Sequence, residues 1–374
     1  MISLFKAKKP QSAIGFDLGT EKLNMVQISR ERNTGEPKVH AALSDYHDAN
    51  YDVLLADPGR MKALIKRSLA KMPFSGRKVV SSLPNSRLQL VFLDYHCHQG
   101  QSEGEALYAA LGHRVGKDLT DYVIDYTPIK PTAGEKQERM ALVALAKRHD
   151  IDLYLELLMG CGLQVVALEI GPIAIRRLIT AMSREDSPEK VVAINFGTQK
   201  SYLTVIWNGD ILLDREMNFG LESILHAIGQ TLEIDYKVAL KMIHDYGLSP
   251  MAEIKTFDSM LDDEQSLVDD EEIKKVIYDI LAPTFAQLAS EIREVLLYIA
   301  SETRGGAVEH IYLLGSMARL RGLDQIIDQY MSIPVKTLNP FYGLSTDPNI
   351  DDFSDLGPLS GIAVATGLAL REIH

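Results

Sequence analysis

The stretch from Ala13 to Ile28 (AIGFDLGTEKLNMVQI) combines the residue types that phosphate and magnesium chemistry require. Its apolar alternation predicts a strand, a glycine turn and a returning strand. The backbone N–H groups of such a turn, at Gly19 and Thr20, form a concave array that suits phosphate oxygens. The carboxylate of Asp17, near the end of the first strand, can hold a hydrated Mg²⁺. We therefore expect Asp17 to be a metal-binding residue, and all three residues to contact a nucleotide.

The chain repeats this hairpin at residues 191–204 (VVAINFGTQKSYLT), which align with the first copy without gaps at an offset of 178 residues (195 − 17). The matched residues are Asn195 with Asp17, Gly197 with Gly19, and Thr198 with Thr20. Two equivalent turns about half a chain apart suggest two similar lobes with a ligand held between them. This pattern resembles the fold of actin, heat-shock protein 70 and sugar kinases, which implies that the paired turns clamp nucleotide phosphates.

Two further segments complete the expected nucleotide site. The strand that ends at Gly315-Ser316 is expected to turn directly into a helix. A glycine at that point lets the backbone approach a flat ligand such as adenine. Gly220, which closes the stretch LDREMNFG (213–220), follows the second hairpin and is assigned to the same site.

Composition excludes several classes of function. The 374 residues are 46% apolar, which suffices for one large core or several smaller ones. A net charge of −12 argues against nucleic acid as the main ligand. The only cysteines, Cys97 and Cys161, are far apart, so we expect no disulfide framework and a reducing compartment. We identify no transmembrane run or signal peptide, and the two histidines of His96-Cys97-His98 lack a third metal ligand.

The order of predicted elements divides the chain into lobes. A first-lobe core at 1–84 is completed by 164–188 and 357–374, with a compact β-α-β-β-α unit inserted at 85–163. The second lobe consists of a core at 189–235 and 305–356 and a helical part at 236–304. Residues 257–272 (FDSMLDDEQSLVDDEE) are expected to form a solvated acidic connection. A long amphipathic helical region follows at 273–302, with Pro283 marking a break or a helix start.

The whole pattern resembles the FtsA and PilM branch of the actin-like fold, and within it the PilM family of type IV pilus assembly proteins. The stretches that carry this resemblance span nearly the full chain. They are IGFDLGT (14–20), DYVIDY (121–126), LDREMNFG (213–220), IYLLGSMARLRGL (311–323), PVKTLNPF (334–341) and GLALREI (367–373). The resemblance implies an α/β, actin-like two-lobed fold of duplicated ribonuclease H-like domains, in which residues 85–163 form the inserted subdomain 1C. The remaining parts would be subdomains 1A, 2A and 2B.

The resemblance also implies partners and a place in the cell. A PilM-like protein would be a cytoplasmic, ATP-binding scaffold at the inner face of the cytoplasmic membrane. It would grip the short tail of a single-pass PilN-type membrane protein in a groove beside subdomain 1C. Contact with PilO-type proteins and with the membrane would be indirect, through that partner. An extended tail could bind there as an added strand or a short helix.

Three departures from the family pattern concern the nucleotide. The second hairpin carries Asn195 where an Asp is usual, which removes one negative neighbour of a Mg²⁺ ion and a candidate general base. The Ala-Glu-x-x-Lys set that would face the ribose is replaced by residues 239–243 (ALKMI). The adenine turn has Gly315-Ser316 instead of two glycines. We therefore expect weak or lost binding of ATP and Mg²⁺, no efficient ATP hydrolysis, and no catalytic residue.

Two other functions remain open from the sequence. An active actin-like ATPase or small-molecule kinase would need a carboxylate base in the cleft, and Asn195 argues against one. An FtsA-like cell-division scaffold would be expected to carry a membrane-binding helix after a flexible linker, whereas this sequence stops at His374 directly after the GLALREI stretch.

Overall fold

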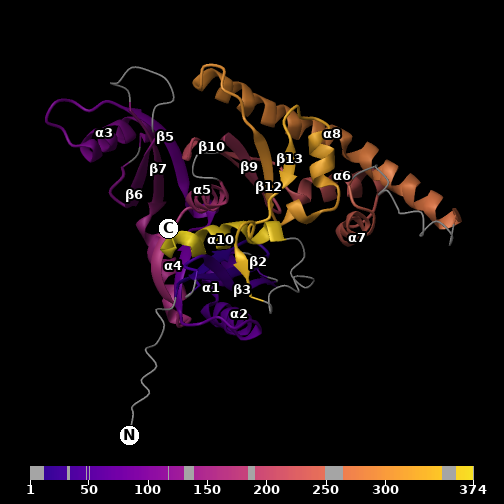
Figure 1. Cartoon of the computed structure of the whole chain (residues 1–374), viewed down its shortest axis with the longest axis horizontal. Coiled ribbons are helices and arrows are strands. Elements are labelled where there is room, and N and C mark those ends of the chain that lie inside the picture. Colours follow the sequence, from indigo (N-terminus) through magenta and orange to yellow (C-terminus); the bar gives the residue numbers. More distant parts are fainter. Residues whose placement is uncertain are drawn as a thin grey trace, which may run out of the picture. The chain divides into compact units, whose positions relative to one another are not determined.

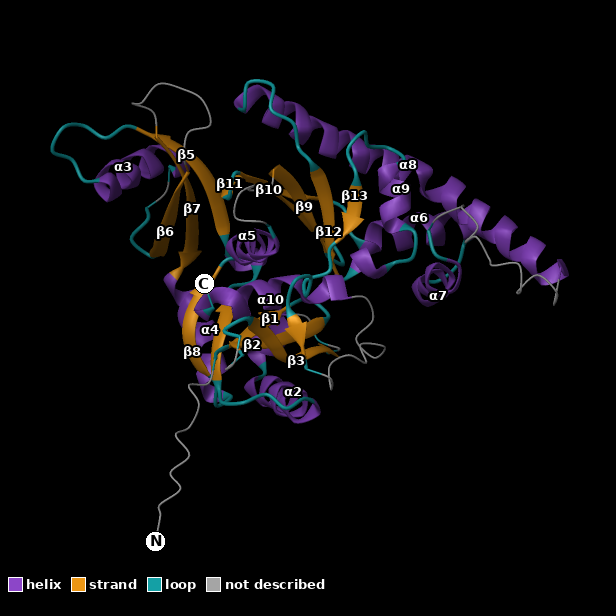
Figure 2. Cartoon of the chain, in the orientation of Figure 1, coloured by secondary structure: helices purple, strands orange, loops and turns teal. Residues whose placement is uncertain are grey.

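The computed structural model describes residues 12–31, 34–47, 49, 51–116, 118–129, 139–183, 190–248, 264–347 and 359–373. For residues 264–269 it describes the backbone only. The chain divides into two compact units. Unit 1 comprises residues 1–188, 209–211 and 339–374, and unit 2 comprises 189–208 and 212–338. Figures 1 and 2 show the elements of each unit. The expected second-lobe core extended to residue 356, but residues from Asn339 onward belong to unit 1 because β14 pairs there with β3.

Unit 1 is built on a six-stranded sheet with the order β14-β3-β2-β1-β4-β8. Its strands are β1 (Ile14–Leu18), β2 (Lys22–Arg30), β3 (Pro37–Tyr46), β4 (Lys78–Ser82), β8 (Gln164–Glu169) and β14 (Ser345–Thr346). The hairpin of β1 and β2 is antiparallel with Asp17 opposite Asn24, whereas β4 runs parallel to β1. The predicted strand–turn–strand at residues 13–28 is therefore confirmed.

Helices cover both faces of this sheet. Apolar residues of α1 (Tyr51–Ala56), α2 (Pro58–Lys71) and α4 (Arg148–Gly160) pack with Phe16 and its neighbours in one buried cluster. On the opposite face lie α5 (Gly171–Met182) and α10 (Ala363–Ala369), where a Cβ on Gly15 or Gly367 would collide with the backbone of Ala365 or Ala174. Small residues thus permit the close packing of α10 against β1 and α5. The flanking turns of α10 are 3₁₀ helices, η6 (Leu359–Ile362) and η7 (Leu370–Glu372).

The inserted segment of unit 1 forms a three-stranded antiparallel sheet with the order β5-β7-β6. Its elements are η1 (Asn85–Arg87), β5 (Gln89–Tyr95), α3 (Glu103–Val115), β6 (Tyr122–Ile129) and β7 (Arg139–Lys147), after which α4 returns to the main sheet. Helix α3 begins at a capping box between Ser102 and Glu105 and buries Leu107 and Leu111 against one face of the sheet. The predicted β-α-β-β-α order is confirmed.

Unit 2 contains a five-stranded sheet with the order β11-β10-β9-β12-β13. The strands are β9 (Lys190–Phe196), β10 (Ser201–Trp207), β11 (Asp210–Met217), β12 (His310–Gly315) and β13 (Val335–Thr337). This order repeats the order of the unit 1 sheet without β14. The strands β9, β10, β11, β12 and β13 take the places of β1, β2, β3, β4 and β8. The gap-free repeat of the two hairpins therefore reflects a repeat of topology.

The helices of unit 2 pack on one side of that sheet in a single large apolar cluster. They are α6 (Leu221–Leu232), α7 (Tyr236–Tyr246), α8 (Glu264–Glu302), η3 (Met317–Arg319) and α9 (Leu323–Asp328). Two expectations were wrong. Helix α8 runs through the exposed Pro283 without interruption, because buried Leu281 and Phe285 anchor it on both sides. It also includes residues 264–272 of the expected acidic connection, while 257–263 lie outside the described residues.

Candidate functional site

The first candidate turn connects β1 and β2 in unit 1. The N–H of Gly19 donates to the carbonyl oxygen of Lys22 at 2.9 Å and closes the turn. Gly19 is partly buried and Thr20 is exposed. Among the described residues, the N–H of Thr20 has no recorded acceptor, so it is available to a phosphate oxygen. The turn thus offers at least one of the donors that the sequence predicted.

Asp17 lies at the base of this turn, between β2 and β4. Its carboxylate accepts weak hydrogen bonds from Asn24 Nδ2 at 3.2 Å and from Ser82 Oγ at 3.4 Å. Burial raises the pKa of Asp17 above the usual value, and these two hydrogen bonds only partly oppose that shift. No Lys or Arg among the described residues forms an ion pair with it. A carboxylate that is held in place without a cation is suited to a Mg²⁺ ion, directly or through water.

His47 is a polar neighbour of the first turn that the sequence did not indicate. Its Nε2 atom lies 3.1 Å from the carbonyl oxygen of Gly19, and its Nδ1 atom lies 2.6 Å from that of Ala49. A neutral imidazole can donate to only one of these oxygens, whereas an imidazolium can donate to both. The backbone N–H of His47 also donates to Glu21. His47 therefore links the turn to Ala49 from the residue that follows β3.

The second candidate turn, between β9 and β10 in unit 2, is held by the start of α6. The N–H groups of Leu221 and Glu222 donate to the carbonyl oxygens of Gly197 and Thr198 at 3.1 and 2.8 Å. The N–H of Gly220 is satisfied by Ser223 Oγ at 3.2 Å. The first amides of α6 are therefore used to fix the turn and are not directed at a ligand. In the described part of unit 2, the N–H of Thr198 has no recorded acceptor.

Close backbone packing explains the glycines around the second turn. A Cβ on Gly197 would lie 2.5 Å from the carbonyl oxygen of Lys200, and one on Gly220 would lie 2.5 Å from that of Thr198. Gly315, at the end of β12, has a positive φ of 91°. A Cβ there would collide with the carbonyl oxygen of Phe196 and come within 2.5 Å of Asn195 Oδ1. Real side chains do not adopt such distances, so these positions accept only glycine.

The structure gathers the candidate residues into two sets. Asp17, Gly19 and Thr20 form one set in unit 1. The second set lies in unit 2 where β9, β10, β12 and α6 meet, and it comprises Asn195, Gly197, Thr198, Gly220, Gly315 and Ser316. Sequence reasoning missed Asn24, Ser82 and His47, because each reaches the first turn from another strand. Ser82 lies near Asp17 because β4 pairs in parallel with β1, and no pattern in the sequence indicates that register.

The described residues contain neither a metal-binding cluster nor a membrane-spanning helix. No cluster of three or more His, Cys, Asp or Glu side chains is arranged to hold a metal ion there, including around His96 and His98. No helix in the described part of the chain is both long enough and apolar enough to cross a bilayer.

Comparison with known proteins assigns the chain to a family. A family model described as "Type IV pilus assembly protein PilM" matches residues 15–253 and 262–373. The chain belongs to the PilM family of type IV pilus assembly proteins. The match includes both candidate turns and the inserted sheet, so the resemblance noted in the sequence is confirmed.

Solved structures agree with this assignment to the PilM family at the level of the fold. A structure described as "PilM-PilN type IV pilus biogenesis complex" matches with a TM-score of 0.73 and 23% identity, covering 97% of this chain and 99% of that one. The ethanolamine utilization protein EutJ from Carboxydothermus hydrogenoformans matches with a TM-score of 0.53 and 14% identity, covering 96% and 90%. The fold is therefore the actin-like α/β fold with two lobes and an inserted subdomain, as predicted.

Proposed function

We propose that this chain is a cytoplasmic scaffold of a type IV pilus or related secretion machine, and that it binds the cytoplasmic tail of a PilN-type membrane protein. The observation that carries this proposal is membership of the PilM family, supported by the similarity to a chain of a PilM–PilN complex over 97% of the length. Contact with PilO-type proteins and association with the inner face of the membrane would follow indirectly, through the PilN-type partner. Fold alone would not support this proposal, since actin-like folds serve many functions.

The inserted sheet of unit 1 offers a surface for such a tail. In the described part of the chain, β5 and β6 each pair only with β7, so each has one unpaired edge. An extended peptide can add to such an edge through main-chain hydrogen bonds. Pro128 lies on β6 opposite Ala141. In sheets, proline occurs where its nitrogen points away from the partner strand. Pro128 therefore leaves one position on the unpaired edge of β6 without an N–H donor.

Binding of the tail tests this proposal directly. The purified chain should bind a fluorescent peptide with the sequence of the partner's cytoplasmic tail, and a scrambled peptide should not bind. Asp125 on β6 and Asp94 on β5 are both exposed, so Asp125→Arg and Asp94→Arg form a matched pair that identifies the edge. If the tail adds as a strand, N-methylation of every second residue should abolish binding when the methyl groups are on the N–H groups that face the sheet. Methylation of the residues between them should leave binding intact. No binding by any tail of a membrane protein encoded beside this chain would contradict the proposal.

We further propose that ATP and Mg²⁺ bind weakly and that hydrolysis is slow or absent. Three features support binding at the first turn: the carboxylate of Asp17, the amide of Thr20, and the hydrogen bond between His47 and the Gly19 carbonyl oxygen. The neutral Asn195 and the amides of α6, which are already used by turn carbonyls, support weakness at the second turn. Titration calorimetry with ATP and Mg²⁺, followed by an assay of phosphate release, tests both statements. Rapid turnover would instead favour the active ATPase or kinase, and filaments in electron micrographs would favour the FtsA-like alternative.

A further inference from the structure

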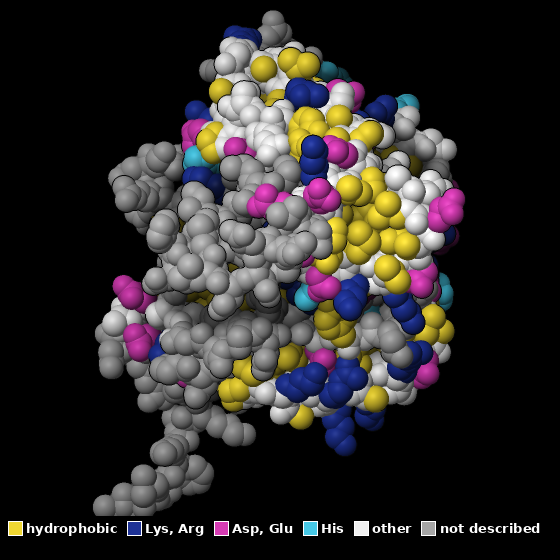
Figure 3. Space-filling view, turned by 90° about the vertical axis from the view of Figure 1, so that its right-hand side faces the viewer, with side chains coloured by type: hydrophobic (Ala, Val, Ile, Leu, Met, Phe, Trp, Pro, Cys, Tyr) yellow, Lys and Arg dark blue, Asp and Glu magenta, His cyan; other side chains and the backbone are white. Residues whose placement is uncertain are grey.

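One stretch of unit 1 has a charge opposite to that of the rest of the chain. Residues 58–78 (PGRMKALIKRSLAKMPFSGRK) contain seven Lys or Arg and no Asp or Glu, whereas the whole chain carries −12. The stretch comprises α2, the loop that follows it, and Lys78, the first residue of β4. Helix α2 buries Met61, Leu64 and Ile65 against the sheet, so its other side faces outward. Figure 3 shows Lys and Arg side chains gathered at the lower end of the view, the end at which α2 lies in Figure 1.

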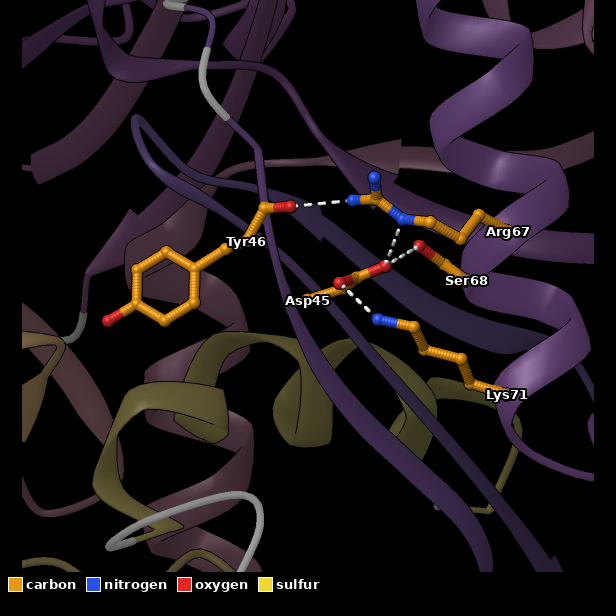
Figure 4. A network of polar contacts seen from close by, with 5 residues as sticks. All are labelled: Asp45, Tyr46, Arg67, Ser68 and Lys71. Atoms are coloured by element: carbon orange, nitrogen blue, oxygen red, sulfur yellow. Dashed lines mark hydrogen bonds and ion pairs between the residues drawn. The ribbon is translucent and has the colours of Figure 1, made fainter.

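Two of these cations have a structural role. Asp45 on β3 accepts hydrogen bonds from Ser68 Oγ at 2.7 Å, from Lys71 Nζ at 2.6 Å and from Arg67 Nε at 3.2 Å. Figure 4 shows Arg67, Ser68 and Lys71 converging on this buried carboxylate from α2. The network fixes α2 to the sheet, because a buried carboxylate with several charge-assisted donors holds its partners in one geometry.

Four other cations are not used in this way. Lys62, Lys66, Arg77 and Lys78 are exposed, and none forms an ion pair with a carboxylate among the described residues. We call these four residues the basic face. Helix α4, which packs against α2, carries the exposed Asp152 and Glu156. Exposed carboxylates of α4 therefore lie on a helix that borders the positive charge of α2.

The N-terminal segment joins the fold beside the basic face. The side-chain amide of Gln27 donates to the carbonyl oxygens of both Ser12 and Ser75, each at 2.8 Å. Ser12 is therefore held close to the loop that carries Arg77 and leads to Lys78 at the start of β4. The sequence that precedes Ser12 (MISLFKAKKPQ) has three lysines, no acidic residue, and Ile2, Leu4 and Phe5.

We propose that the basic face docks directly onto anionic phospholipid headgroups, so that the chain has its own contact with the membrane that carries its partner. This inference rests on the proposed function only for the presence of a membrane partner. Clustered Lys and Arg side chains at a surface attract the anionic headgroups of a bilayer. A long polyanion such as nucleic acid would also meet the net negative charge of the remaining surface, which disfavours that occupant.

Vesicle flotation of the full-length chain tests the proposal. The chain should float with phosphatidylcholine vesicles that contain phosphatidylglycerol, and it should not float with phosphatidylcholine alone. Raising the salt concentration should release it, because headgroup attraction is screened. The variant Lys62→Gln/Lys66→Gln/Arg77→Gln/Lys78→Gln should bind at least about tenfold more weakly. Since these side chains have no carboxylate partner, the variant should keep the melting temperature of the wild type.

A matched variant separates a local effect from net charge. Lys237→Gln/Lys241→Gln/Lys275→Gln/Arg114→Gln removes the same number of exposed cations elsewhere, and it should float like the wild type. Equal loss in both variants, or flotation that needs no anionic lipid, would overturn the proposal. The same holds if the wild type stays unbound to vesicles but retains an acidic protein or nucleic acid on the basic face. Binding of the PilN-type tail is measured without vesicles, so its failure would be seen separately.

Discussion

The turn after β1 and the turn after β9 occupy equivalent places in two sheets of matching strand order, yet different interactions hold them. The first turn has a charged residue at its base, Asp17, and a glycine whose added Cβ would meet only Lys22 O, at 3.2 Å. The second has the neutral Asn195 and is enclosed by Gly197, Gly220 and Gly315, none of which has room for a Cβ. The two copies of the hairpin therefore differ: the first has the carboxylate that we expect to bind a ligand, and the second is tightly packed.

The largest effect should come from adding a side chain beside the tightly packed second turn. Gly315→Ala would force a side chain into a left-handed conformation and against the end of β9, so we expect a loss of about 4 kcal/mol of unfolding free energy. Gly19→Ala should cost at most about 1 kcal/mol, because the neighbouring oxygen need move only slightly. Urea unfolding followed by the fluorescence of Trp207, the single tryptophan, reports unit 2, and circular dichroism reports the whole chain. Equal losses for the two variants would remove the distinction between the turns.

The third strands, β3 and β11, also differ, in the interactions that each makes with a carboxylate. Asp45 on β3 is buried, and although burial opposes the shift, hydrogen bonds from Lys71, Ser68 and Arg67 hold its pKa below the usual value. Its stabilising effect is therefore present above pH 4, approximately the unfolded pKa, and is lost as pH falls through the lower folded pKa. Asp45→Ala should cost about 3 kcal/mol at pH 7.

The deficit of Asp45→Ala should shrink in acid, where the wild type also loses the interaction. Calorimetric melting temperatures measured from neutral to acidic pH check this expectation. A variant that removes an exposed carboxylate of the same unit, Asp152→Ala, serves as the control and should melt like the wild type at each pH. A deficit that stays constant down to the most acidic pH would show that Asp45 acts through packing and not through its charge.

Asp214 on β11 has the opposite pH dependence. Burial raises its pKa from 3.8 to about 6, and the single hydrogen bond from Thr204 Oγ1 at 2.6 Å only partly opposes this. A raised carboxyl pKa means that the folded state binds the proton more tightly, so stability falls as pH rises from about 4 to above 6. Asp214→Asn keeps the acceptor and should therefore stabilise unit 2 by about 2 kcal/mol at pH 8 and by almost nothing near pH 4. Urea titrations that follow Trp207 fluorescence at both pH values test this; a gain independent of pH would contradict it.

The sequence predicted the parts of this comparison that depend on local pattern. Glycine turns after apolar strands identified both hairpins, and their gap-free alignment predicted the repeated topology. The contacts from other strands were not predictable. Ser82 and His47 reach the first turn only because β4 and β3 have particular registers, and periodicity does not specify register between distant strands. Helix α1 was missed because six residues carry too little pattern. The helix at Pro283 was misjudged because tertiary packing overrode a local breaker.

The smallest expected effect tests the chemical side of the comparison. If Asp17 supports a Mg²⁺ ion, Asp17→Asn should weaken the binding of ATP by about tenfold in the presence of Mg²⁺, since one carboxylate ligand is lost. Calorimetric titrations without Mg²⁺ provide the control, and there Asp17→Asn should not weaken binding, because the loss of a negative charge lessens the repulsion of the phosphates. If Asp17→Asn binds ATP with Mg²⁺ as tightly as the wild type does, Asp17 is not a ligand of the ion, and the first turn lacks the chemistry expected of it.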